Sequence, residues 1–301
     1  MKPVLNALQM READRRTIED FGLPGFSLME TAGRAATREI AAHFGPPDEL
    51  SVCCLCGKGN NGGDGLVVAR LLADAGADVH VQMVLGLDGL SPDAQKNLSV
   101  LTELQAADAS LMVTISSGAD LVDAGFDLIV DAILGTGLSA ALRDPVSNAV
   151  KSINDSGIPV VSIDVPTGLN ADTGVMMSDC VIADMTVTMG ALKQGLLFND
   201  GPRCSGEIIL AEIGIPRCAL AGENGTAPTQ TWLIEHDDVA DVLPRRARDA
   251  HKYSAGMLLA IAGSPGLTGA PTLASTAAAR TGAGAVVCAC PQTVQSTLAA
   301  R

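Results

Sequence analysis

The chain is poor in aromatic and in basic residues, and both shortages limit what it can bind. Of its 301 residues, one is Trp, one is Tyr and five are Phe, which is too few to stack the bases of a single-stranded nucleic acid. Its 20 Lys and Arg are outnumbered by 34 Asp and Glu, so the net charge is −14. Proteins that bind a phosphate backbone rely on clustered basic side chains. We therefore expect neither DNA nor RNA as a partner.

Long apolar runs are lacking as well. No apolar run approaches the roughly 18 residues that a membrane-spanning helix needs, and residues 1–16 lack the continuous apolar segment of a signal peptide. Among the eight cysteines, Cys53 and Cys56 have Cys-x-x-Cys spacing, but they lie in the apolar, strand-like run 51–56, and other cysteines lie in similar runs. This favours buried thiols over disulfides or a zinc site. We expect a cytoplasmic protein that does not bind membranes.

Glycine and aliphatic residues are abundant, and their order indicates an α/β fold. The chain has 32 Gly and is 47% hydrophobic. Its Val- and Ile-rich runs are continuous rather than alternating, which is typical of strands buried on both faces of a parallel sheet. We predict a Rossmann-like three-layer αβα sandwich with a mostly parallel sheet over residues 1–225. The expected strands are 51–56, 79–85, 111–115, 127–134, 159–165, 180–189 and 206–213, and the expected helices are 6–20, 27–43, 65–76, 92–107 and 145–156.

The composition changes near residue 226. Residues 222–232 are typical of a linker, and a strand (257–264), a small-residue helix (268–284) and a second strand (285–291) follow. One β-α-β unit of this size is marginal as an independent domain. We therefore expect residues 226–301 to be a linker and the incomplete N-terminal part of a second α/β domain.

The segment from Gly57 to Gly65 is the strongest local signal. It contains G-x-G-x-x-G between a predicted strand and a predicted helix, where a helix N-terminus offers unpaired N–H groups to anions. A dinucleotide fingerprint also needs an acid at the end of the next strand, and residues 84–86 there read Val-Leu-Gly. Asp64 would also repel a pyrophosphate bound as in a dehydrogenase. A Rossmann NAD-dependent oxidoreductase is thus a weaker interpretation, and a plain Asn-Gly turn accounts for even less of the segment.

Two further predicted strands end in polar, turn-rich segments that begin at Asp131 and Asp164. Because the carboxyl ends of parallel strands meet at one edge of a sheet, we expect these segments and the Gly-rich segment to converge. Taken singly, each Asp is explained equally well as a helix cap or turn former. Taken together, the Asn, Asp and Thr oxygens of the three segments suit a hard cation rather than zinc or copper.

Four separated motifs resemble, in the right order, those of the NAD(P)H-hydrate epimerase family, the YjeF N-terminal domain. They are GKGNNGGDGLVVARLL (57–72), DAILGTGL (131–138), SIDVPTGLNADTG (162–174) and TVTMGALKQGLLFNDGP (186–202). The resemblance covers about residues 1–220. Residues 251–287 resemble the start of a ribokinase-like, ADP- or ATP-dependent NAD(P)H-hydrate dehydratase domain.

The resemblance implies a bifunctional enzyme of nicotinamide nucleotide repair. Its epimerase half would interconvert the R and S forms of hydrated NADH or NADPH. The later Gly-rich stretch and catalytic Asp of the dehydratase domain are not in these 301 residues, so we expect no dehydratase (lyase) activity from them. ADP or ATP would be a cofactor only of a complete dehydratase domain. We also expect a homo-oligomer.

The resemblance also implies site residues. One K⁺ per epimerase site would be held by Asn61, Asp131 and Thr167, where Thr167 replaces the Ser of some members. Lys193 matches a family lysine whose role the sequence leaves open. The substrate contacts would be Asn60, Asn61, Gly62, Gly63, Asp64, Gly135, Thr136, Gly137, Leu138, Ser139, Ala140, Ala141, Asp164 and, in the tail, Ala270.

Inversion at nicotinamide C6 requires a C6–O or C6–N bond to break and re-form. A carboxylate beside the carbinolamine would move the proton, and Asp164 is the first candidate, with Asp64 the second. The four histidines lie outside the motifs. The alternative is a non-catalytic interaction scaffold of the same fold. Such scaffolds tend to lose the acidic ligand loop, whereas this chain keeps Asn60, Asn61 and Asp64.

Overall fold

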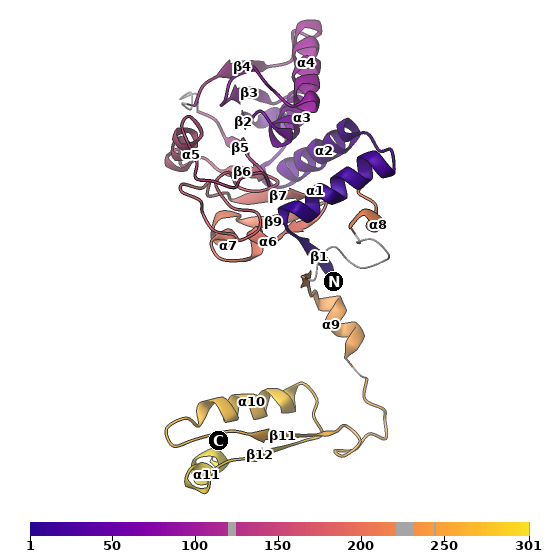
Figure 1. The fold of residues 1–301 in the computed structure, drawn as a ribbon, viewed down its shortest axis with the longest axis vertical. Helices are drawn as coiled ribbons and strands as arrows, with labels where there is room; N and C mark the ends of the chain where they lie inside the picture. The colour runs from indigo at the N-terminus through magenta and orange to yellow at the C-terminus, as the bar shows by residue number, and fades with distance from the viewer. Residues whose placement is uncertain (120–124, 221–230, 244, 301) are drawn as a thin grey trace. The chain divides into compact units, whose positions relative to one another are not determined.

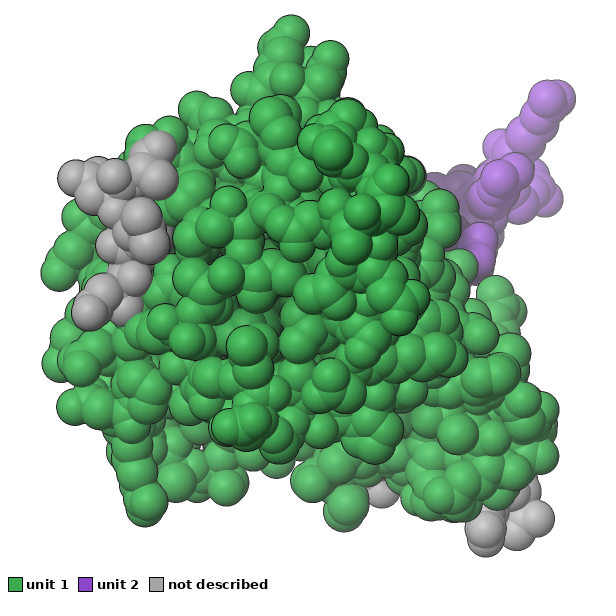
Figure 2. Space-filling view, turned by 90° about the horizontal axis from the view of Figure 1, so that it is seen from above, with its two compact units in different colours: residues 1–235 green, residues 236–301 purple. Residues whose placement is uncertain are grey.

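The computed structural model describes residues 1–119, 125–220, 231–243 and 245–300. The chain divides into two compact units, residues 1–235 and 236–301, which Figure 2 shows in different colours. The predicted domain boundary between residues 225 and 226 lies outside the described residues.

The first unit is built on a seven-stranded parallel sheet (Figure 1). Its strand order is β4-β3-β2-β5-β6-β7-β9, so the direction of winding reverses between β2 and β5. Ligands of open α/β sheets bind beyond the strand ends at such a reversal. The strands are β2 (Ser51–Cys56), β3 (Asp78–Met83), β4 (Val113–Ser117), β5 (Leu128–Ala132), β6 (Val160–Ile163), β7 (Met185–Met189) and β9 (Glu207–Ala211).

Helices cover both faces of this sheet. Figure 1 shows α2 (Gly25–Phe44), α3 (Asn60–Asp74) and α4 (Pro92–Ala107) on one side and α5 (Val146–Asp155) on the other. In β2, Cys54 and its alternate neighbours pack in the α2–α4 core, whereas Cys53 and Leu55 pack in the α5 core. The strand is therefore buried on both faces, which is why its sequence is continuously apolar. The predicted three-layer αβα sandwich is confirmed.

A small second sheet was not expected from the sequence. β1 (Lys2–Leu5) pairs in parallel with β8 (Leu192–Lys193) and antiparallel with β10 (Trp232–Leu233). Strands this short have no measurable periodicity. The expected strand 180–189 likewise begins only at Met185. The remaining elements of this unit are α1 (Ala7–Arg15), η1 (Arg16–Asp20), η2 (Pro47–Glu49), α6 (Gln194–Leu197), α7 (Gly201–Cys204) and α8 (Arg217–Leu220).

Helix α3 starts earlier than its sequence suggests. It begins at Asn60, so the Asn-Asn-Gly-Gly-Asp stretch is its first turn and not a loop. Gly57 has no room for a side chain, since a Cβ there would lie 1.9 Å from the carbonyl oxygen of Ile133. At Gly62, a Cβ would lie 2.0 Å from the carbonyl oxygen of Gly57. These glycines let the turn after β2 pack against the turn after β5.

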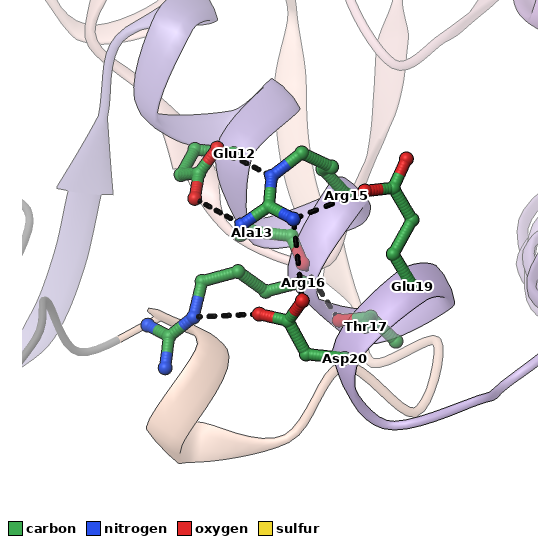
Figure 3. A network of polar contacts seen from close by, with 7 residues as sticks. All are labelled: Glu12, Ala13, Arg15, Arg16, Thr17, Glu19 and Asp20. Carbon is green, nitrogen blue, oxygen red and sulfur yellow. Dashed lines mark hydrogen bonds and ion pairs between the residues drawn. The ribbon is translucent and has the colours of Figure 1, made fainter.

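An exposed ion-pair network holds the end of α1 (Figure 3). Arg15 bonds Glu12, Glu19 and Asp20, and Arg16 lies 3.8 Å from Asp20. It spans the π-helical segment η1, a geometry that often occurs at functional sites. Arg15 and Arg16 are thus engaged on the outer side of the helix.

The second unit is a β-α-β arrangement, as predicted. β11 (Met257–Ile261) and β12 (Ala285–Ala289) are parallel and are connected through α10 (Gly269–Arg280). α9 (His236–Val242) precedes them and α11 (Gln292–Ala299) follows. Ile261 is 80% exposed, and a two-stranded sheet with uncovered apolar side chains is marginal by itself. Across both units, no helix in the described ranges is long and apolar enough to cross a membrane.

Candidate active site

A cavity of about 740 Å³ opens in the first unit at the carboxyl ends of β2 and β5. This volume lies within the usual range for small-molecule sites. The turn after β2 and the start of α3 form one part of the wall, and residues 133–144 after β5 form another. α1 contributes Met10, Arg11 and Asp14, while Asp164 and Lys193 come from the ends of β6 and the small second sheet. The cavity therefore lies where the sheet topology predicts a ligand.

Asp164 and Lys193 form a buried ion pair in this cavity. The Lys193 ammonium lies 2.5 Å from Asp164 Oδ1, and their side chains are 1% and 15% exposed. The ammonium also donates to the carbonyl of Met189 at 2.6 Å and to Thr188 Oγ1 at 3.1 Å. All its protons thus have acceptors, one of which is the carboxylate of Asp164.

The backbone of Asp164 is unusual as well. Its φ is +67°, in the left-handed region that non-glycine residues seldom adopt and that often marks functional positions. Thr188 Oγ1 and the Met189 amide lie at 3.4 and 3.3 Å from the same Oδ1 that Lys193 holds. Oδ2 is 3.4 Å from where a Cβ on Gly135 would stand. One carboxylate oxygen is thus fixed, while the other is turned toward the 135–141 turn.

Asp14, Asp64, Asp93 and Asp144 also line the cavity. Of these, Asp64 on α3 and Asp14 on α1 lie close enough to Asp164 to interact with its charge, and neither has a hydrogen-bond donor from the described chain. Burial, with smaller contributions from Asp164 and Asp14, raises the pKa of Asp64 well above its usual value. Burial also raises the pKa of Asp14 to about 6, against the opposing attraction of Lys193. The cavity therefore contains two acids with raised pKa values beside one that is ion-paired.

Asn61 is the other unsatisfied group. Its side-chain Oδ1 and Nδ2 are buried, and neither has a hydrogen-bond partner among the residues that the structure describes. Its Cγ lies 3.3 Å from the position of a Cβ on Gly135, close to Asp164. A buried amide without a partner costs free energy, so this position fits a ligand or an ion that would bond to it.

Asp131 lies behind the cavity wall and has its own partners. It is fully buried, and its oxygens accept from Ser162 Oγ, the Ile133 amide, and the amide and hydroxyl of Thr167, at 2.7–3.3 Å. The Thr167 hydroxyl accepts in turn from the Leu134 amide. Burial raises the pKa of Asp131, while these hydrogen bonds oppose the shift. Together the pair fixes the turn that leads from β5 into the cavity wall.

Comparisons with known proteins agree with this architecture. Residues 25–195 match the family model described as YjeF-related protein N-terminus. The chain belongs to this family.

Its curated relatives are named for nicotinamide nucleotide repair. A bifunctional NAD(P)H-hydrate repair enzyme of Salinibacter ruber is 45% identical over 99% of this chain and 56% of its own length. The chain thus spans about half the length of such relatives. An NAD(P)H-hydrate epimerase of Limosilactobacillus fermentum is 37% identical over 69% of this chain and 95% of its own length. The crystal structure of yeast ynu0 has a TM-score of 0.55 and 25% identity, and covers 64% of this chain and 82% of its own.

Not all of the positions expected from the YjeF resemblance reach the cavity. Gly62 and Gly63 are buried and are not among the lining residues; a Cβ on Gly63 would lie 2.6 Å from Met29 Sδ. Asp131 and Thr167 lie behind the wall. Ala270 is exposed and belongs to the second unit. The expected residues that line the cavity are Asn60, Asn61, Asp64, Gly135, Thr136, Gly137, Leu138, Ser139, Ala140, Ala141 and Asp164.

Asp14 was not predicted from the sequence, and the role of Lys193 was left open. Asp14 follows Met10 by four residues, and the buried residues of α1 are Ala7, Met10 and Ala13. An acid on the apolar face of an amphipathic helix was the available signal. Lys193 lies in a two-residue strand, and its burial depends on β1, which the sequence did not predict.

Proposed function

We propose that this chain interconverts the R and S epimers of hydrated NADH or NADPH. The observation that carries the proposal is Asp164, with one oxygen held by Lys193 and the other turned into a cavity of about 740 Å³ at the topological switch point. The relative whose length the chain covers almost completely is named an NAD(P)H-hydrate epimerase. The scaffold alternative is not favoured, because Asn60, Asn61 and Asp64 line the cavity.

Epimerisation at C6 needs both a proton acceptor and a proton donor. In a ring-opening route, a base takes the proton of the C6 hydroxyl, the C6–N1 bond breaks, and its electron pair stays on N1, which receives a proton. The open form has an aldehyde at C6. After rotation about C5–C6, the same steps in reverse close the ring from the other side, with no net change in atoms or electrons. Asp164, the ion-paired carboxylate, is suited to act as the base.

The remainder of the cavity suits a dinucleotide. The first N–H groups of α3 lie at its edge, where Gly59 and Asn60 line the wall, and helix N-termini attract phosphate. Arg11 and Arg143 also line the cavity, and within the described ranges the Arg143 guanidinium has no hydrogen bond or ion pair. They would offset the negative charge of the acids when a diphosphate binds.

We infer potassium as the resident ion, and the unpartnered amide of Asn61 is what supports it. Asn61 would supply an amide oxygen, and the ion would reduce the cost of the buried Asp131 charge. Asp131 already accepts four hydrogen bonds, so the protein itself also supplies partners for its carboxyl group. A cytoplasmic location fits the five free, buried cysteines, and the homo-oligomer stays a prediction.

The test is direct. The purified protein is incubated with R-hydrate, and the two epimers are separated by chromatography over time. We expect the catalysed approach to the equilibrium mixture, and we expect Asp164→Asn to lower the rate at least about 100-fold, the usual contribution of one proton-transfer residue. An unchanged epimer composition with the wild-type chain would refute the function, and a fully active variant would refute the role of Asp164.

A further inference from the structure

We propose that Asp14 is a second catalytic acid–base residue of this cavity, acting from α1 while Asp164 acts from the sheet. The inference rests on the proposed epimerase function and assigns the proton donor that such a reaction needs.

The position of Asp14 in the cavity supports this role. It lines the cavity, yet its own helix offers it no partner. Arg15 and Arg16 are engaged with Glu12, Glu19 and Asp20 on the outer side (Figure 3). The Thr17 hydroxyl donates to the carbonyl of Ala13. An unpaired carboxyl on a buried helix face costs stability, and no structural contact within the described chain accounts for it.

Asp164, Asp64 and Asp14 have different surroundings, which suit them to different roles. Asp164 has Oδ1 bonded to the Lys193 ammonium and is assigned the role of proton acceptor. Asp64 lies among acids, and burial raises its pKa well above its usual value, which favours its protonated form. Asp14 has a pKa of about 6, and a group that exchanges its proton near the working pH is the more effective acid–base catalyst.

Asp14 and Asp164 lie on different parts of the cavity wall. Asp164 follows β6, whereas Asp14 belongs to α1, so the two carboxyl groups approach the cavity from different layers. The charged groups near Asp14 are Lys193 and Asp164 from the sheet side and Asp64 from α3. Arg11 of its own helix lines the same cavity. A substrate between α1 and the strand ends would have a donor and an acceptor on separate sides, as bond breaking and re-closure require.

The experiment compares wild type with Asp14→Asn in the full chain, using R-hydrate from pH 5 to 8.5. We expect kcat to fall about 100-fold with KM changed less than about three-fold. Wild-type kcat should decline as the pH rises above about 6, because Asp14 loses its proton there, and the variant should lack this dependence. Asp20→Asn is the matched control, because Asp20 is an exposed acid of the adjoining segment that bonds Arg15; it should behave as wild type.

The stability of Asp14→Asn is a further control, because it should rise while the activity falls. The folded protein binds the Asp14 proton more tightly than the unfolded chain does, so ionisation above pH 6 destabilises the fold. Asp14→Asn should therefore melt several degrees higher than wild type at pH 7.5, and the gap should close as the pH falls from 6 to 4. Lost activity in a more stable variant cannot be a folding defect.

The outcomes separate the two proposals. Wild-type kcat in Asp14→Asn, or an unchanged pH profile, would overturn the role of Asp14 and leave the epimerase function intact. A wild-type chain that epimerises neither hydrate would overturn the function, and with it the acid role. Carboxyl-carbon NMR then tests the remaining claim, that a group missing from Asp14→Asn titrates near pH 6; its absence overturns that claim too.

Discussion

Among single residues, Lys193 is the one whose neighbours explain it most completely. A fully buried ammonium needs hydrogen-bond acceptors for its protons and a compensating charge, and Met189, Thr188 and Asp164 supply them. Its position within the cavity wall makes it a positioning residue for Asp164. The sequence marked Lys193 only through the family resemblance, because a lysine alone gives no sign of burial.

The pair predicts a specific pattern of stability. Lys193→Met should lower the free energy of unfolding by about 3–5 kcal/mol, because it leaves the Asp164 carboxylate without its partner. Adding Asp164→Asn should recover most of the loss, since a neutral amide needs no counter-charge. Urea denaturation of the wild type, the two single variants and the double variant gives the coupling energy. Additive effects would mean that the two charges do not stabilise each other.

At the scale of the elements, sequence patterns predicted the helices and strands that have a clear apolar pattern or a capping residue. Helix α4 is found at the expected residues, 92–107, because Ser91 caps it and Pro92 starts it. The main strands follow from their continuous apolar runs. β1 and β8 could not be predicted, since four and two residues contain no period, and the start of α3 was hidden by glycines that disfavour helices.

The site, like the fold, could be predicted from the sequence only in part. Strand ends were predictable, because parallel topology brings the segments after β2, β5 and β6 to one edge. The side chains that reach the cavity could not be predicted, because a shift of one residue moves a side chain from the cavity wall into the protein interior. Asp131 and Thr167 are the example, for both lie at strand ends and both face inward. Asp14 depends on how α1 packs on the sheet, which no local pattern encodes.

The close contact between the turns after β2 and β5 leads to a prediction for Gly57. Gly57→Ala should lower the free energy of unfolding by about 2 kcal/mol or more, because its Cβ would meet the Ile133 carbonyl at 1.9 Å and a backbone atom cannot rotate away. Gly137→Ala is the control, since nothing lies within 4 Å of a Cβ there. Equal melting temperatures for the two variants would show that the turns have room to separate.

For the whole molecule, the net charge of −14 opposes an anionic substrate. Five carboxyl groups line the cavity (Asp14, Asp64, Asp93, Asp144 and Asp164), against only three cations, Lys193, Arg11 and Arg143, in the described part of the chain. Lys193 is neutralised by Asp164, so Arg11 and Arg143 are left to attract a diphosphate. A bound monovalent cation would reduce this imbalance at the place where the acids are buried.

Potassium binding is therefore tested on the folding of the whole chain. The protein is heated in potassium chloride and in tetramethylammonium chloride at equal ionic strength, so that only a site selective for the smaller ion distinguishes them. At ten times its dissociation constant, an ion stabilises the fold by about 1.4 kcal/mol, or about 3 °C for a unit of this size.

Asn61→Ala is the variant that decides where such an ion lies. The Asn61 amide has no partner in the described part of the protein, so its removal should change the melting temperature in tetramethylammonium very little and should abolish the gain in potassium. Asp131→Ala is less suited, because it removes four hydrogen bonds in either salt. Equal melting of the wild type in both salts would instead assign Asp131 to fixing the turn after β5, and would leave the Asn61 amide for the substrate.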